Sequence, residues 1–170
     1  MDRDDAIRSA QERALSVFER RPSAALSSAK ASGHLDEGLH CIVSSRELDV
    51  RMDMPKEFGG DGSGPTPGFF IRAGLIGCVA IGIKATAARE RISLESVDVD
   101  VEMDFDDGAI FGLGDNTAAP LETRLTIALQ SPAPWAAVEA MARRALAADP
   151  YFLAFRDPQR VNFTLVAKRA

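Results

Sequence analysis

The clearest pattern in the chain is an alternation of apolar and acidic residues. Every second residue from Val97 to Phe105 is apolar, and each residue between them is Asp or Glu. A period of two predicts a strand that turns one face to the core and the other, a row of carboxylates, to solvent. Residues 121–130 alternate again after a glycine-rich loop, so we expect the two segments to pair as a hairpin.

Weaker alternation indicates further strands. Residues 38–45 and 48–54 predict a second hairpin joined by a tight turn. Residues 24–33 indicate a weak strand before this hairpin. Residues 161–168 predict the last strand of the chain, which follows a short apolar turn at residues 151–155.

Three helices are predicted from patterns with a period near 3.6. Residues 4–20 carry a narrow apolar stripe, which is typical of a helix lying on a larger surface. A second helix runs from Pro67 to about Arg91, with Thr66 as a good N-cap, and it is apolar nearly all round. The third occupies residues 134–149. Its expected inner stripe consists of Trp135, Val138, Met141, Ala142, Ala145 and Leu146.

The order of these elements favours an α+β fold. Strands outnumber helices and do not alternate with them singly, so we expect a mostly antiparallel sheet with a long buried central helix and a second helix. A chain of 170 residues can bury one sizeable core. We expect one domain at residues 23–170, preceded by a helical extension at residues 1–22.

The composition of the chain argues against several kinds of binding partner. A net charge of −5 argues against nucleic acid and anionic membranes. The longest uncharged stretch, AGLIGCVAIGI from Ala73 to Ile83, has eleven residues, whereas a membrane span needs roughly 20. The charged start of the chain lacks the apolar segment of a secretory signal. Two cysteines form no disulfide framework, so we expect a cytoplasmic protein without a membrane partner.

Common motifs for metal, phosphate and nucleophilic chemistry are weak. His40 and Cys41 are adjacent, so in a strand their side chains point to opposite faces and do not chelate one metal together. The sequence GGDGSG lacks the lysine of a phosphate-binding loop. With two histidines and no elbow motif, no Ser-His-Asp arrangement is indicated. We therefore expect no metal and no cofactor.

One combination of motifs resembles a known family. In MPKEFGGDGSGPTPGFFIRAGLIGC, residues 54–78, a Gly- and Pro-rich loop leads into a small-residue apolar helix with Cys78 near its centre. A hairpin precedes it; an acidic strand, a strand partner, a second helix and a closing strand follow. Over residues 24–168 the chain is similar to the OsmC/Ohr family of osmotically inducible and organic hydroperoxide resistance proteins. The resemblance implies an intertwined homodimer whose central helices are wrapped by sheets.

For active members, the resemblance implies thiol-dependent reduction of organic hydroperoxides in oxidative stress defence. A cysteine on the central helix attacks the peroxide, a second cysteine before a proline resolves it as a disulfide, and Arg and Glu side chains activate the first. Cys78 matches the first cysteine. Asp149 precedes Pro150 where the family has Cys-Pro, and Gly68 stands where active members have Glu. The chain therefore resembles a divergent member that lacks the second cysteine.

The surroundings of Cys78 predict a slow thiol. Its neighbours three and four positions away are apolar, and the helix start at Pro67 is too remote to favour a thiolate. If Asp149 lies near the sulfur, its carboxylate raises the thiol pKa. Arg46 and Arg51 lie in the preceding hairpin, and neither can be aligned with the activating arginine. The other cysteine, Cys41, is in a strand and in a different place.

Two functions remain open, and with them whether the chain is an enzyme. The first is an OsmC-like homodimer that has lost the two-cysteine cycle and binds a small apolar ligand at the dimer interface. The alternative is a one-Cys thiol-dependent organic hydroperoxide reductase with catalytic Cys78, which an external thiol returns to the reduced form. A third, blander role is an interaction protein assembled through its N-terminal helix. The expected pocket residues are Phe69, Phe70, Asp149, Tyr151, Phe152 and Phe155.

Overall fold

The computed structural model describes residues 2–167 of the chain and confirms the α+β class. Within these residues five strands form two separate antiparallel sheets, in the orders β1–β2–β3 and β4–β5. The helical elements are α1 (Arg3–Arg20), η1 (Pro22–Ala25), η2 (Lys56–Phe58), α2 (Pro67–Glu90), α3 (Asp107–Ile110), α4 (Trp135–Ala147) and α5 (Pro150–Arg156). The strands are β1 (Ser32–His34), β2 (Cys41–Ser45), β3 (Leu48–Met52), β4 (Ser96–Asp104) and β5 (Glu122–Gln130).

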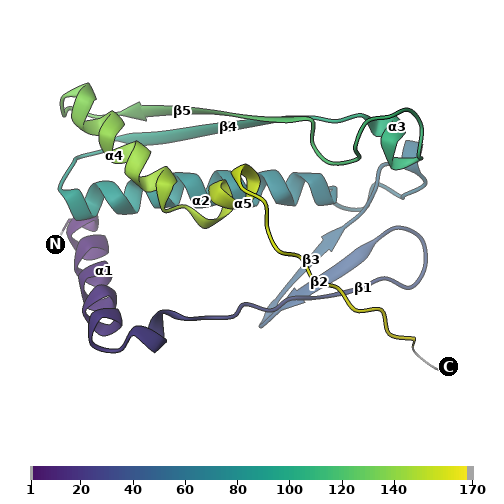
Figure 1. Cartoon of the computed structure of the whole chain (residues 1–170), viewed down its shortest axis with the longest axis horizontal. Coiled ribbons are helices and arrows are strands. Elements are labelled where there is room, and N and C mark those ends of the chain that lie inside the picture. Colours follow the sequence, from purple (N-terminus) through teal and green to yellow (C-terminus); the bar gives the residue numbers. More distant parts are fainter. Residues whose placement is uncertain (1, 168–170) are drawn as a thin grey trace.

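The long helix α2 is the centre of the molecule, as Figure 1 shows. The β4–β5 hairpin runs along one side of it, α4 crosses it, and the β1–β3 sheet lies near its N-terminal end. The predicted hairpin is confirmed, because β4 and β5 pair from Ser96 opposite Gln130 to Asp104 opposite Glu122. The apolar face of this hairpin packs on α2, and its carboxylates face outward.

Local sequence explains the ends of α2. The Thr66 hydroxyl accepts a hydrogen bond from the Phe69 backbone N–H at 3.3 Å, and Pro67 takes the first helical position. At the other end Arg91 adopts the left-handed conformation with φ 59°. One side of α2 then packs against α4, β4 and the loop that joins α2 to β4. The core residues are Leu75, Val79, Ile83, Ala87, Leu94, Val138, Met141 and Ala145.

The loop that leads into α2 is held by one buried carboxylate. Asp53 is 1% exposed and accepts backbone N–H groups of Met54 (2.7 Å), Asp61 (3.2 Å) and Ser63 (2.8 Å), as well as the Ser63 hydroxyl (2.8 Å). The hydrogen bonds from Ser63 are the main cause that lowers the pKa of Asp53 to about 2. A Cβ on Gly60 would lie 1.9 Å from the Met54 carbonyl oxygen, so the loop closes only around glycine there.

The face of α2 opposite the core is open in the single chain. Val79 and Ile83 are buried, whereas Ile81 between them is 71% exposed. The expectation that α2 is buried on most sides is therefore wrong for one chain alone. By length and composition α2 could also cross a membrane, and only 17% of its most apolar stretch is buried. Arg72 and Lys84 flank the uncharged eleven-residue stretch but lie inside α2, so that stretch alone does not exclude a span. The core helix of a soluble protein meets the same criteria of length and composition.

Several predicted elements differ from the observed ones. Residues 161–167 are extended but form no strand, and residue 168 lies outside the described residues. Residues 151–155 belong to helix α5, since Asp149 caps this helix and Pro150 starts it. Most of the weak strand at residues 24–33 is absent, and β1 takes up only its last two residues. Trp135, expected on the inner stripe of the second helix, is 60% exposed because it is the first residue of α4.

Helix α1 docks on the C-terminal end of α2. Lys84 on α2 donates a hydrogen bond to Asp4 on α1 at 3.0 Å and another to the Leu94 carbonyl oxygen at 2.8 Å. Arg89 donates to the Gln11 side chain at 2.8 Å. These contacts tie α1, α2 and the loop before β4 together, and α1 then runs away from α2 (Figure 1).

Candidate functional site

Cys78 lies at the centre of α2, beside the junction of α4 and α5. It lines a groove of about 440 Å³ together with Asp149 and Tyr151, and the thiol is partly exposed. Small residues form much of the α2 wall of this groove. At one of them, Gly82, an added Cβ would lie 3.2 Å from Asp149 Oδ2, so the small side of α2 lets the carboxylate approach closely.

Asp149 occupies the site because it begins α5. Its Oδ1 accepts the backbone N–H groups of Tyr151 at 3.1 Å and Phe152 at 2.7 Å. Aspartate at the N-cap followed by proline at the first helical position is a strong helix start. Asp149 is only 3% exposed, and its carboxylate lies close to α2 at Gly82. Asp149 and Pro150, which stand where the sequence comparison expects Cys-Pro, thus start helix α5.

The electrostatics of this site favour a protonated thiol. Burial is the largest cause that raises the pKa of the Cys78 thiol, and the Asp149 carboxylate raises it further by hydrogen bonding and by its negative charge. The backbone N–H of Tyr151 acts in the opposite direction. The structure places Asp149 in the same groove as Cys78, the arrangement for which this effect was predicted. Burial and the Asp149 carboxylate thus both act against the thiolate form of Cys78.

No arginine among residues 2–167 activates this thiol. Arg89 lines the same groove, but its guanidinium donates to Gln11 and Thr86. Arg51 lies in β3, and Arg46 lies in the turn before β3 with φ 55°. None of the three is among the groups that shift the thiol pKa. Among residues 2–167 no positively charged side chain therefore stabilises a thiolate at Cys78.

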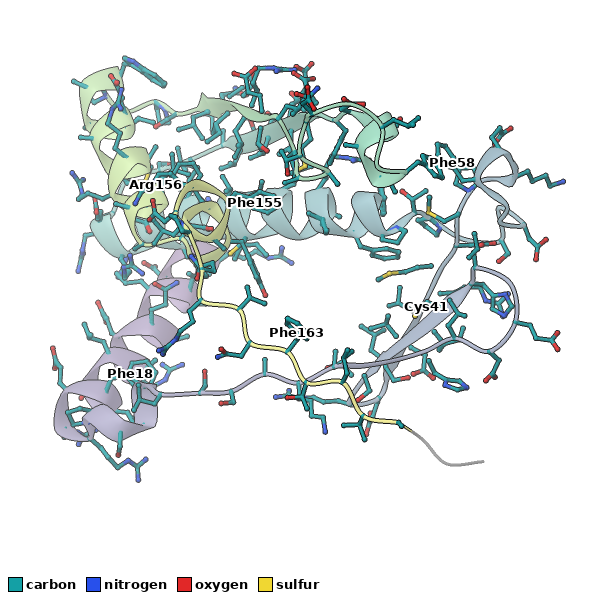
Figure 2. The ribbon with its side chains drawn as sticks, turned by 45° about the vertical axis from the view of Figure 1, so that its right-hand side comes forward. Phe18, Cys41, Phe58, Phe155, Arg156 and Phe163 are labelled. Atoms are coloured by element: carbon teal, nitrogen blue, oxygen red, sulfur yellow. The ribbon has the colours of Figure 1, made fainter. Side chains whose placement is uncertain are left out.

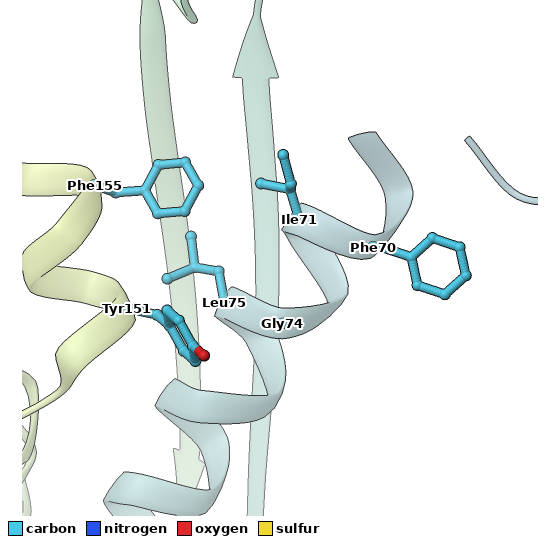
Figure 3. A pocket seen from close by; sticks show the side chains of 6 residues that line it. All are labelled: Phe70, Ile71, Gly74, Leu75, Tyr151 and Phe155. Atoms are coloured by element: carbon cyan, nitrogen blue, oxygen red, sulfur yellow. The ribbon is translucent and has the colours of Figure 1, made fainter. Parts of the chain in front are cut away.

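An apolar cavity of about 450 Å³ adjoins the groove. In Figure 3 Tyr151 and Phe155 on α5 face Ile71 and Leu75 on α2, whereas Phe70 points away on the other side of α2. The cavity shares Gly74 and Tyr151 with the groove that contains Cys78. Its lining residues are Phe70, Ile71, Gly74, Leu75, Tyr151 and Phe155.

The structure brings together some of the expected pocket residues. Phe70, Tyr151 and Phe155 line the apolar cavity, and Asp149 lines the adjoining groove. Phe69 lies outside both; it is 49% exposed and packs edge-on against Phe70, with ring centroids 5.5 Å apart. Phe152 packs against the core instead. The sequence did not single out Ile71 or Leu75, because both resemble ordinary core positions of an apolar helix.

The remaining candidate groups lie away from this site. Cys41 is in β2, in the other sheet, and both cysteines are free thiols (Figure 2). On the outer face of the β4–β5 hairpin Arg124 pairs with Asp104 at 2.5 Å, and it also pairs with Glu102 and Glu122. Within residues 2–167 no three His, Cys, Asp or Glu side chains gather as metal ligands would.

Comparisons with known proteins agree on one family. The sequence model of the family described as OsmC-like protein matches residues 60–164. An OsmC-like protein from Mycoplasma pneumoniae has a similar structure, with a TM-score of 0.65 and 15% identity over 76% of this chain and 88% of that one. None of the curated proteins matches the chain.

Two further solved structures are described by an activity. An organic hydroperoxide resistance protein from Legionella pneumophila is 26% identical, with a TM-score of 0.53 over 78% of this chain and 91% of that one. A putative organic hydroperoxide resistance protein from Vibrio cholerae, with captopril bound in one of its active sites, is 21% identical, with a TM-score of 0.53 over 78% and 88%.

Proposed function

Because this chain belongs to the family of OsmC-like proteins, we propose that it is a homodimer that binds a small apolar ligand and has lost the two-cysteine hydroperoxide cycle. The family match over residues 60–164 confirms the resemblance predicted from the sequence. The observation that carries the proposal is the Asp149 carboxylate beside the Cys78 thiol. A peroxidatic cysteine reacts as a thiolate, whereas burial and Asp149 both raise the pKa of this thiol.

The missing resolving thiol supports the same proposal. Asp149 stands at the end of the groove, and Cys41 lies in the separate β1–β3 sheet. Among the described residues Cys78 therefore has no thiol beside it with which to form a disulfide. A two-cysteine cycle within one chain would require a large movement of β2.

The homodimer is supported by apolar surface that the single chain leaves exposed. Ile81 on the open face of α2 is 71% exposed, and Val161 and Phe163 in the extended C-terminal segment are 79% and 83% exposed (Figure 2). Large apolar side chains that are exposed in a single chain are typical of an interface. We expect a second copy to pack on the α2 face and the alternating residues 161–167 to pair with a strand of the partner.

The apolar cavity supports the ligand. Its volume of about 450 Å³ falls within the roughly 300–1,000 Å³ of small-molecule sites. We expect the apolar part of the ligand to lie between Phe155, Leu75 and Ile71, and its polar end to reach the groove at Tyr151. The Vibrio cholerae protein with captopril bound provides a precedent for an organic molecule in this fold.

Binding of N-phenyl-1-naphthylamine, a neutral apolar fluorophore, tests the ligand site. We expect its fluorescence to rise on titration with the protein, and Phe155→Ser to weaken the affinity by about tenfold through loss of an aromatic wall. Phe58→Ser is the matched control, because Phe58 is similarly exposed in η2, outside the cavity. Equal weakening by both substitutions, or no binding at all, would rule out the cavity as the ligand site.

The alternative is a one-Cys hydroperoxide reductase. It is supported by the partly exposed Cys78 sulfur in a groove and by the Tyr151 N–H, which favours the thiolate. In this reaction the thiolate attacks a peroxide oxygen, the O–O bond breaks, an alcohol leaves and Cys78 becomes a sulfenic acid. Two external thiols then reduce it, releasing water and one disulfide.

Mass spectrometry of Cys78 decides between the two functions. The reduced protein is mixed with cumene hydroperoxide, and oxidation of the Cys78 peptide is followed with Cys41 in the same sample as internal reference. We expect Cys78 to oxidise no faster than Cys41. Rapid sulfenic acid formation at Cys78, together with peroxide turnover that Cys78→Ser abolishes, would establish the reductase instead.

A further inference from the structure

One face of α1 docks on α2 in its first half and continues beyond α2 in its second half. Asp4 and Gln11 accept hydrogen bonds from Lys84 and Arg89 of α2. At 3.6 residues per turn, Leu15 and Phe18 follow Gln11 on the same face, four and seven positions later. The docking face of α1 therefore makes hydrogen bonds where it meets α2 and presents Leu15 and Phe18 farther on.

The apolar half of this face is uncovered. Leu15 is 54% exposed and Phe18 is 41% exposed. The reason is geometric, because α2 ends at Glu90 while α1 runs away from it, as Figures 1 and 2 show. By contrast Ala88, where α1 meets α2, is only 2% exposed. The two exposed side chains thus project from the helix face that contacts α2 through Asp4 and Gln11, where α1 is partly buried.

This face continues the open face of α2. Arg89, which bonds to α1, also lines the groove along α2 that contains Cys78 and Ile81. Figure 1 shows that α1 and the β1–β3 sheet extend from α2 to one side, whereas β4 and β5 lie on the other. Through Arg89, α1 thus joins α2 at the end of the groove that contains Ile81.

We propose that α1 is an arm that packs its Leu15 and Phe18 face against a second copy of this chain. The inference rests on the proposed homodimer and adds a contact outside the region matched by the family model, residues 60–164. In a two-fold dimer the interface is isologous, so each copy contributes one arm and receives the other. In this proposal the function of the N-terminal helix is to stabilise the dimer.

Charge favours a second copy over nucleic acid or an anionic membrane. The other faces of α1 carry both signs in near balance, with Glu12 and Glu19 beside Arg13 and Arg20. Nucleic acids and anionic membranes carry charge of one sign, and proteins bind them through clusters of residues of the opposite charge. A copy of the chain instead presents exposed apolar side chains of its own, among them Ile81 and Phe163.

Sedimentation velocity of the full chain over a dilution series tests the arm. We expect the double substitution Leu15→Ser with Phe18→Ser to raise the dimer dissociation constant by roughly tenfold or more. Phe18→Leu keeps the apolar contact and should retain most of the affinity. Arg13→Ser is the matched control, because Arg13 is exposed on the opposite side of α1. Circular dichroism spectra verify that each variant keeps its helices.

A substitution on α2 separates failure of the arm from failure of the dimer. Ile81→Arg places a charge at the centre of the open face and should give monomers. If Ile81→Arg dissociates the dimer and the double substitution in α1 does not, the arm is overturned and the dimer stands. If the wild-type chain is monomeric, or Ile81→Arg leaves its dimer intact, the proposed dimer across α2 is overturned, and the arm with it.

Hydrogen exchange in the wild-type chain provides a measurement that needs no variant in α1. We expect the backbone amides of residues 12–20 to exchange slowly at concentrations that favour the dimer and faster after dilution to the monomer. Exchange in residues 12–20 that is independent of concentration, while residues 74–85 of α2 do respond to dilution, would contradict the arm and leave the dimer in place.

Discussion

The carboxylate of Asp149 caps helix α5 and at the same time lies beside the thiol of Cys78 on α2. The two roles are linked, because the cap fixes the carboxylate where it raises the thiol pKa. Gly82 makes room for this approach, since a Cβ there would lie 3.2 Å from Asp149 Oδ2. A residue that stabilises the fold thus also sets the reactivity of the cysteine.

Replacement of Asp149 by asparagine should make Cys78 more reactive. The asparagine side chain keeps the cap but loses the negative charge, so the thiol pKa should fall toward its ordinary value. Each unit of pKa changes the thiolate fraction about tenfold, and we expect alkylation of Cys78 by iodoacetamide at neutral pH to be roughly three- to tenfold faster. Mass spectrometry of the Cys78 peptide measures the rate, with Cys41 as internal reference. Unchanged alkylation would show that Asp149 does not control the thiol.

Replacement of Asp149 by alanine should destabilise the protein relative to asparagine. Alanine leaves the N–H groups of Tyr151 and Phe152 without their cap, whereas asparagine can still accept them. Loss of an N-cap costs about 1 kcal/mol, so we expect the free energy of unfolding of Asp149→Ala to be lower than that of Asp149→Asn by about this amount. Urea unfolding followed by circular dichroism measures the difference. Coincident unfolding curves would mean that α5 does not depend on its cap.

Two positions of α4 that look equivalent in the sequence should differ in their contribution to stability. Met141 is completely buried, and Met141→Ala should lower the free energy of unfolding by about 2–5 kcal/mol through the cavity it leaves. Trp135 is 60% exposed at the start of the helix, and Trp135→Ala should change the free energy by about 0.5 kcal/mol or less. Urea unfolding of both variants tests this order, and a larger effect at Trp135 would contradict the packing described for α4.

The sequence predicts an element well where its pattern has a clear period and its partner lies in the same chain. Every second residue of β4 is apolar, and β5 pairs with it over its whole length, so this hairpin was predicted correctly. Apolar and polar residues also alternate in residues 161–167. Such alternation shows on which face of a strand each side chain lies, but it does not show whether another strand is present to pair with it. In the single chain this segment stays unpaired.

The site was predictable only in part for a similar reason. The short apolar run at residues 151–155 has no period, so periodicity does not distinguish a turn from the helix α5. The available signal was local, because Asp149 followed by Pro150 is a typical helix start. Proximity between Asp149 and Cys78 depends on how α5 packs against α2, which spacing in the sequence does not encode. It was anticipated through the resemblance to the family.

The loop before α2 should make part of the stability dependent on acid pH through Asp53. Its four hydrogen bonds hold the pKa of the carboxyl at about 2, below the ordinary value of 3.8. A carboxyl whose pKa is lower in the folded state than in the unfolded chain stabilises the folded state. This stabilisation is complete at pH values above the pKa that the group has in the unfolded chain. This contribution should therefore be present above about pH 4 and be lost as the pH falls toward about 2.

Asp53→Asn should remove this contribution and its pH dependence together. The two oxygens of Asp53 accept four hydrogen bonds, whereas asparagine has one oxygen and an NH₂ group that only donates. Some of these donors would lose their acceptor, so the variant should also be less stable at neutral pH. Asp61→Asn is the matched control, because the exposed Asp61 contributes only its backbone N–H to Asp53. Urea midpoints measured from neutral to acid pH should converge for the wild type and Asp53→Asn, and stay parallel for the wild type and Asp61→Asn. A constant gap between the wild type and Asp53→Asn would show that the folded loop does not lower the pKa of Asp53.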